Sequence, residues 1–238
     1  MPQSTFDVRT DRSLIREAGA SVRYVLARIV APGASSRERR MPANVSLVLD
    51  RSGSMGDAHK FGLAREAVEM ALRMLRPDDR FSLVVYDTEI DVLSRSAHAT
   101  EDAKRVALRA LADVGPRGGT DLSGGWLRGC EQVAEFVDRE SVSRCLLLTD
   151  GLANHGIRDR GTLADHASGL RSRGVTTSTF GVGADFDERL LRDMAHSGGG
   201  NFYFIEGASQ IPTMMTGELA EALEVTMRDA AIEVTVPR

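Results

Sequence analysis

Cysteine is scarce in this chain, with only Cys130 and Cys145 among its 238 residues. We expect Cys130 on a helix and Cys145 at the start of a strand, both as small buried apolar residues, so no disulfide is predicted. A chain of this length buries enough apolar surface to fold without a disulfide or a structural metal. The composition therefore excludes the class of small domains that depend on disulfides.

Long apolar runs are also missing. The N-terminal segment MPQSTFDVRTDR has no apolar stretch that could serve as a signal peptide. No run approaches the roughly 20 apolar residues that cross a bilayer. These absences predict a soluble, cytoplasmic protein with no membrane partner. Arginine outnumbers lysine 28 to 2, a bias that suggests a GC-rich bacterial genome.

An excess of positive charge is lacking as well. The net charge is −4, which gives no support to a nucleic-acid partner. Residues 1–41 carry eight arginines against four acidic residues. We interpret this local excess as a solvated pair of strands rather than a docking surface.

The sequence does contain an alternation of short apolar strands with longer helical segments. Segment 45–50 is almost continuously apolar, as expected of a strand covered on both faces, whereas 60–76 has apolar residues at helical spacing and ends before Pro77. Strands are expected at 45–50, 80–87, 89–96, 143–150, 175–183 and 201–206. Helices are expected at 60–76, 99–114, 126–139, 162–173, 187–198 and 209–227. This alternation predicts an α/β fold, in which helices cover both faces of a mostly parallel sheet.

One strand of the series should run against the others. Segment 89–96 follows strand 80–87 after a gap too short for a crossover helix. It is therefore expected to turn back as an antiparallel strand at one edge of the sheet.

The flanks of the chain alternate differently. Segments 6–17 and 21–32 alternate apolar and polar residues like an antiparallel hairpin, with one buried and one solvated face per strand. A two-stranded hairpin alone is marginally stable, so we expect 230–236 to pair with it as a small flanking antiparallel sheet. These expectations divide the chain into an N-terminal hairpin segment (1–42), a main domain (43–228) and a C-terminal strand (229–238).

Polar side chains follow the ends of two predicted strands. Asp50 ends strand 45–50 and is followed by Ser52 and Ser54, and Asp150 ends strand 143–150. In a parallel sheet such strand ends lie at one edge, where ligands bind. A third hydroxyl, in the Gly-rich loop that contains Thr120, comes just before a predicted helix.

Two interpretations of the serines explain only part of this pattern. A helix cap would use Ser52 or Ser54 but would leave Asp50 unexplained. A hydrolase nucleophile is suggested by SGSMG, one residue from G-x-S-x-G, and by Asp150 and His196, which follow in triad order. Against it, a serine replaces the first glycine, His196 lies inside a predicted helix, and no oxyanion segment precedes the serine.

A metal site explains more of the residues. Its candidate ligands are all hard oxygen donors, namely Asp50, Ser52, Ser54, Thr120 and Asp150. Because no His or Cys lies nearby in the motif, the set suits Mg²⁺, or alternatively Mn²⁺ or Ca²⁺, better than Zn²⁺.

Other residues and motifs are weaker. GVGADF lacks the third glycine of a dinucleotide fingerprint, and the chain has no P-loop. Asp121 is expected to cap the helix that follows Thr120, and Asp57 to lie in a turn. His59 and His155 are interpreted as solvated loop residues rather than ligands.

The candidate ligands also carry a resemblance. DRSGS at 50–54 matches the D-x-S-x-S motif of von Willebrand factor A domains, and Thr120 in GGTD and Asp150 in LLLTDG match the other two segments, in order. The resemblance covers residues 43–228, and GVGADFDERLLRDMAHSGGGNFYFIE is similar to the bacterial branch. It implies a three-layer Rossmann-like domain whose six-stranded sheet has the order 3-2-1-4-5-6.

The resemblance further implies a complete metal-ion-dependent adhesion site. By that likeness Ser52 and Ser54 bind the ion directly, Thr120 directly or through water, and Asp50 and Asp150 mostly through waters. Neutral hydroxyls leave the ion's charge poorly neutralised, so an Asp or Glu of a protein partner can complete its coordination. The implied function is metal-dependent protein binding without catalysis. A serine hydrolase that uses Ser54, and a regulatory or assembly subunit partnered with an ATPase, are the alternatives.

Overall fold

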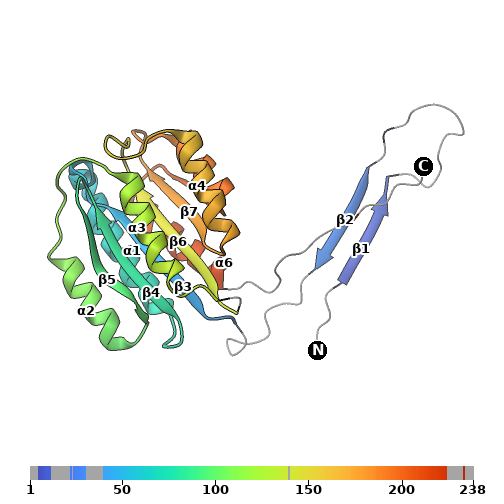
Figure 1. Ribbon diagram of the computed structural model, residues 1–238, viewed down its shortest axis with the longest axis horizontal. Coiled ribbons are helices and arrows are strands. Elements are labelled where there is room, and N and C mark those ends of the chain that lie inside the picture. The colour runs from blue at the N-terminus through green and yellow to red at the C-terminus, as the bar shows by residue number, and fades with distance from the viewer. Residues whose placement is uncertain are drawn as a thin grey trace, which may run out of the picture. The chain divides into compact units, whose positions relative to one another are not determined.

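The computed structural model describes residues 5–11, 22, 24–30, 40–138, 140–223 and 233. The chain divides into two compact units, of which one contains a two-stranded sheet and the other spans Met41–Leu223 (Figure 1). No helix within the described residues is long and apolar enough to cross a membrane.

The two-stranded sheet confirms the predicted N-terminal hairpin pairing. Strands β1 (Thr5–Thr10) and β2 (Val25–Val30) run antiparallel. The prediction of one buried face per strand is wrong, because every β1 residue is exposed and only one β2 residue is partly buried. Alternation of apolar and polar residues identifies the face of a strand that a second layer of structure could cover. That face is buried only where such a layer packs against it. The predicted partner strand 230–236 lies outside the described residues, apart from Glu233.

The larger unit is built on a six-stranded sheet. Its strands are β3 (Ala43–Asp50), β4 (Arg80–Tyr86), β5 (Ile90–His98), β6 (Val142–Thr149), β7 (Thr176–Val182) and β8 (Gly199–Ile205). Their order is β5-β4-β3-β6-β7-β8, with β5 antiparallel to β4 and all other pairs parallel. This confirms the predicted order and edge strand, and places the reversal of strand order between β3 and β6.

Helices cover both faces of this sheet (Figure 1). One core cluster lies under α1 (Lys60–Met74), α2 (Glu101–Ala112) and α6 (Ile211–Leu223), and the other under α3 (Leu122–Ala134), α4 (Arg160–Ser172) and α5 (Glu188–Ser197). Short 3₁₀ segments, Gly53–His59 and Ala208–Gln210, precede α1 and α6. On β3, Leu47 and Leu49 enter the first cluster and Val48 the second. A strand covered on both faces has no solvated side, which explains its almost continuously apolar sequence.

Helix α3 begins earlier than its sequence suggests. It starts at Leu122, not at 126, because Asp121 caps it by accepting a hydrogen bond from the Gly124 amide (2.9 Å). The glycines inside this first turn do not break the helix, because Gly125 packs against the ring of Tyr86, where a Cβ would overlap it. The predicted role of Asp121 as a cap is confirmed. The two cysteines, on α3 and within β6, are buried and free.

Close packing of α3 against the sheet gives a testable prediction. A Cβ on Gly129 would overlap Val48 Cγ2 and lie 3.0 Å from Ser46 Oγ, both on β3. Gly129→Ala should therefore lower the free energy of unfolding by about 1–3 kcal/mol, since overpacking outweighs the gain in helix propensity. The matched control is Gly169→Ala on α4, where a Cβ meets nothing within 4 Å and stability should rise by about 0.5–1 kcal/mol. Urea unfolding of both variants checks this, and equal effects would contradict it.

Candidate functional site

Both strand-end carboxylates lie where the strand order reverses. Asp50 is the last residue of β3, and Asp150 directly follows β6. The two strands are parallel neighbours, with Leu49 opposite Leu148, so their carboxyl ends lie side by side. Asp50 and Asp150 are 0% and 1% exposed. Two buried carboxylates lose hydration and repel each other, so this edge of the sheet favours a positive charge.

Hydrogen bonds hold both oxygens of Asp50. The Ser52 amide donates to Oδ1 (2.7 Å), and the Thr149 hydroxyl donates to Oδ2 (2.6 Å). Burial raises the pKa of Asp50 from 3.8 to about 6, against the effect of these hydrogen bonds and with a further rise from the charge of Asp150. A cation placed beside this carboxyl would stabilise its ionised form.

The two serines and Asp150 form a continuous row of oxygens. Ser52 Oγ lies 3.2 Å from Ser54 Oγ, and Ser54 Oγ donates to Asp150 Oδ1 at 2.7 Å. Ser52 is 2% exposed, whereas Ser54 is exposed to solvent. Both ends of the row are therefore buried, and Ser54 in its middle is the member that meets solvent.

Thr120 reaches the same place from the loop between α2 and α3. It is 3% exposed, its amide donates to Asn154 Oδ1 (2.8 Å), and its carbonyl accepts from the Asn154 and His155 amides. A Cβ built on Gly151 would lie 3.6 Å from Ser54 Oγ and 3.7 Å from Thr120 Oγ1. Hydroxyl oxygens from two loops thus both lie close to the position, next to Asp150, that a Cβ on Gly151 would take.

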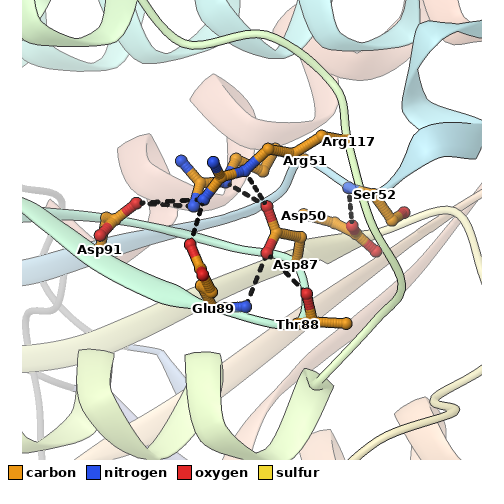
Figure 2. A network of polar contacts seen from close by, with 8 residues as sticks. All are labelled: Asp50, Arg51, Ser52, Asp87, Thr88, Glu89, Asp91 and Arg117. Carbon is orange, nitrogen blue, oxygen red and sulfur yellow. Dashed lines mark hydrogen bonds and ion pairs between the residues drawn. The ribbon is translucent and has the colours of Figure 1, made fainter.

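A network of ion pairs connects the loops that lie beside the site (Figure 2). Arg51, which follows β3 and is 5% exposed, donates through Nε to Asp87 Oδ2 (2.8 Å) and through Nη2 to Asp91 Oδ2 (2.6 Å). Arg117 Nε also donates to Asp87 Oδ2 (2.8 Å), and its amide donates to the Arg51 carbonyl (2.7 Å). One buried carboxylate therefore connects the loop after β3, the loop before α3 and the β4–β5 hairpin.

The site also contains a cation from the protein itself. Lys60, the first residue of α1, places Nζ 2.6 Å from Asp150 Oδ2. Its side chain is 16% exposed, and the Asp150 side chain is fully buried. Part of the negative charge at the strand ends is thereby neutralised.

The donor atoms fit a hard divalent cation. Hydroxyl and carboxylate oxygens are the ligands that Mg²⁺, Mn²⁺ and Ca²⁺ prefer. Neighbouring ligands on an octahedral ion with bonds of about 2.1 Å lie about 3 Å apart, close to the 3.2 Å between the two serine oxygens. In the part of the chain that the structure describes, no group of three or more His, Cys, Asp or Glu could hold a metal ion. An ion here would therefore depend on Ser52, Ser54 and Thr120.

The geometry does not assemble a hydrolase triad. Among the described residues, Ser54 Oγ has hydrogen bonds with Asp150 and Ser52, and no histidine lies between the serine and the carboxylate. His196 is exposed in the last turn of α5. His155 is an exposed loop residue, as predicted, whereas His59 is exposed but ends the 3₁₀ segment before α1.

Sequence reasoning missed several residues of the site. Thr149 was not singled out, although its hydroxyl binds Asp50 from a position 99 residues away. The pairing of Arg51 with Asp87 has no local sequence signal. Lys60 did carry a sequence signal, because the chain has two lysines and 28 arginines.

Comparisons with known proteins agree with the fold. A family model described as von Willebrand factor type A domain matches residues 44–217. The chain is 27% identical to the uncharacterized protein YfbK of Escherichia coli (strain K12) over 200 residues, 83% of this chain and 34% of YfbK. It is 30% identical to the uncharacterized protein sll0103 of Synechocystis sp. over 213 residues, 85% of this chain and 48% of sll0103. The chain thus spans between a third and a half of the length of these two relatives.

Solved structures share the fold at lower identity. A von Willebrand factor type A protein from Catenulispora acidiphila superposes with a TM-score of 0.74 at 21% identity, covering 93% of this chain and 50% of that one. Proximal thread matrix protein 1 of the mussel byssus, whose metal-ion-dependent adhesion site (MIDAS) motif is occupied by zinc, superposes with a TM-score of 0.60 at 18% identity. The superposition covers 76% of this chain and 48% of that one. Domains of this type are typically adhesion or protein-interaction modules, mostly without enzymatic activity, and some hold a metal at this motif.

Proposed function

The chain belongs to the von Willebrand factor type A family, and on that premise we propose that it is a binding module that grips a carboxylate of a protein partner through a divalent cation. Ser52, Ser54 and Thr120 would bind the ion directly, and Asp50 and Asp150 would act mainly through waters. The ion would supply a positive charge that neutral hydroxyls do not cancel, so an Asp or Glu of the partner is attracted to it. Mg²⁺ is the preferred ion, with Mn²⁺ or Ca²⁺ as alternatives.

The observation that carries this proposal is the convergence of oxygens at Gly151. Ser54 Oγ and Thr120 Oγ1 lie 3.6 and 3.7 Å from the position of its missing Cβ, and Ser54 Oγ lies 2.7 Å from the buried Asp150 carboxylate. The carboxylates of Asp50 and Asp150 are buried, whereas Ser54 is exposed to solvent. A cation bound to this set of oxygens would therefore have a protein side and a side open to a partner.

The metal is tested by calorimetric titration with Mg²⁺, Mn²⁺, Ca²⁺ and Zn²⁺, the last because the mussel protein holds zinc. Ser54→Ala removes a direct ligand, and affinity should fall by about tenfold or more. Ser172→Ala is the matched control, since that hydroxyl binds the Gly169 carbonyl on α4, and it should leave affinity unchanged. Failure of the unaltered protein to bind any of these ions at millimolar concentration would contradict the proposal.

Carboxylate capture and catalysis are tested separately. A short peptide with one Asp should bind in Mg²⁺ but not in EDTA, and the same peptide with Asn should bind in neither. No esterase activity above background is expected. Stoichiometric labelling of Ser54 by a serine-reactive phosphonate would overturn the proposal in favour of a hydrolase.

A further inference from the structure

Both carboxylate oxygens of Asp150 have partners, and the two partners differ in kind. Oδ1 accepts from the Ser54 hydroxyl (2.7 Å), and Oδ2 is paired with Lys60 Nζ (2.6 Å). A serine that donates its proton to Asp150 still has lone pairs for a cation. An ammonium group has no lone pair and carries its own positive charge. Lys60 therefore competes with a cation for Asp150, whereas Ser54 does not.

The start of α1 is a poor place for a lysine. The positive end of a helix dipole lies at its N-terminus, so a cation in the first turn is unfavourable there. Helices α2 to α5 each begin with a side-chain cap, from Thr100, Asp121, Asp159 and Asp187. Helix α1 begins after His59 in the left-handed conformation, with no side-chain cap and no acidic residue in its first turn.

The segment before Lys60 is bent as well. Ala58 and His59 have φ of 49° and 56°, a left-handed conformation that residues other than glycine seldom adopt. No other non-glycine residue in the described part of the chain has a positive φ. The ion pair with Asp150 therefore holds the Lys60 ammonium group in an unfavourable position. The helix dipole disfavours a cation at the start of α1, and the left-handed bend just before Lys60 is strained.

We propose that Lys60 is an internal counter-ion that occupies Asp150 when no divalent cation is bound, and that the cation must displace it. This inference rests on the proposed metal function and adds an affinity-determining residue to the site. Lys60 would compensate the buried Asp150 carboxylate in the metal-free protein. It would also weaken cation binding, since part of the binding free energy is spent on breaking the Lys60–Asp150 pair.

The variant Lys60→Met tests this directly. It keeps a long apolar stem and removes the charge, so affinity for Mg²⁺ and Mn²⁺ in calorimetric titration should rise by about tenfold, which corresponds to about 1.4 kcal/mol. The matched control is Lys104→Met, the only other lysine. Lys104 pairs with Glu101 and donates to the Leu75 carbonyl, outside the site, so its loss should leave affinity unchanged.

A second measurement needs no substitution. Because the chain has two lysines, ¹³C-lysine labelling gives one set of side-chain NMR signals for Lys60 and one for Lys104, assigned with the two variants. Titration with Mg²⁺ should shift the ε-carbon signal of Lys60 and leave that of Lys104 in place. This readout stays informative if Lys60→Met folds poorly, since the Lys104 variant alone assigns both signals.

The outcomes separate the two proposals. The counter-ion role would be overturned if Lys60→Met bound Mg²⁺ with equal or lower affinity than the unaltered protein. It would also be overturned if Mg²⁺ bound the unaltered protein without shifting the Lys60 signal. Either result would leave the metal site standing. Absence of binding in both the unaltered protein and Lys60→Met would overturn the metal site itself. Tighter binding in Lys60→Met with a shift confined to Lys60 is the expected result.

Discussion

Replacing Asp87 by alanine is expected to lower the free energy of unfolding by about 3–5 kcal/mol, the cost of leaving a buried charge without its partner. Asp87 is 1% exposed and accepts from both Arg51 and Arg117. Burial alone would raise its pKa, but the Glu89 amide and the two arginines hold that pKa below its usual value. Without Asp87, the ion pair that Arg51 keeps among the described residues is the one with Asp91, whose side chain is half exposed.

Chemical denaturation measured in urea tests this expectation. Asp193→Ala is the matched control, because Asp193 pairs with Arg160 at 3.1 Å and both side chains are about half exposed. An exposed pair contributes about 0–1 kcal/mol, so this variant should remain near the stability of the unaltered protein. If Asp87→Ala cost no more than Asp193→Ala, the network in Figure 2 would not be what holds the loops together.

The metal-free protein should lose about 3 kcal/mol of stability through Asp50 as pH rises from about 4 to above 6. Burial raises the pKa of Asp50 from 3.8 to about 6, so between these values the folded protein binds a proton that the unfolded chain has released. The stabilising contribution is complete below the unfolded pKa and is lost as pH rises through the folded one. A shift of about two units corresponds to about 3 kcal/mol.

Asp50→Asn isolates this contribution from other titrating groups. The variant carries no ionisable group at the position, so the difference in unfolding free energy between it and the unaltered protein should change with pH only in this window. Both proteins are measured in EDTA, because a bound cation would stabilise the ionised carboxyl and remove the effect. Parallel stability–pH curves for the two proteins would show that the buried carboxyl does not have a raised pKa.

Much of the fold could be predicted from the sequence because it depends on short-range pattern. The near-continuous apolar run of β3 indicated a strand covered on both faces, and the short gap between β4 and β5 required an antiparallel pair. The start of α3 was misplaced, because Gly124 and Gly125 suggest a loop unless the ring of Tyr86 is known to lie against the helix. The buried face expected of β1 and β2 was wrong for a related reason, since alternation cannot reveal whether a second layer is present.

By itself the sequence determined which residues stand at the strand ends. Asp50 ends an apolar strand, Ser52 and Ser54 come just after it, and Asp150 follows a second apolar strand. In a parallel sheet the strand direction is enough to bring such positions to one edge. The family relationship follows from the same residues and is supported by the match over 44–217.

Only the tertiary structure decided which charges these residues meet. The Lys60–Asp150 pair joins positions 90 residues apart, and the Arg51–Asp87 pair joins positions 36 apart. Ion pairs between such distant positions leave no periodicity in the sequence, because they depend on where loops end after the sheet has formed. The physical reason is that hydrophobic pattern selects strands and helices locally, whereas compensation of a buried charge depends on the one arrangement in which its partner comes within reach.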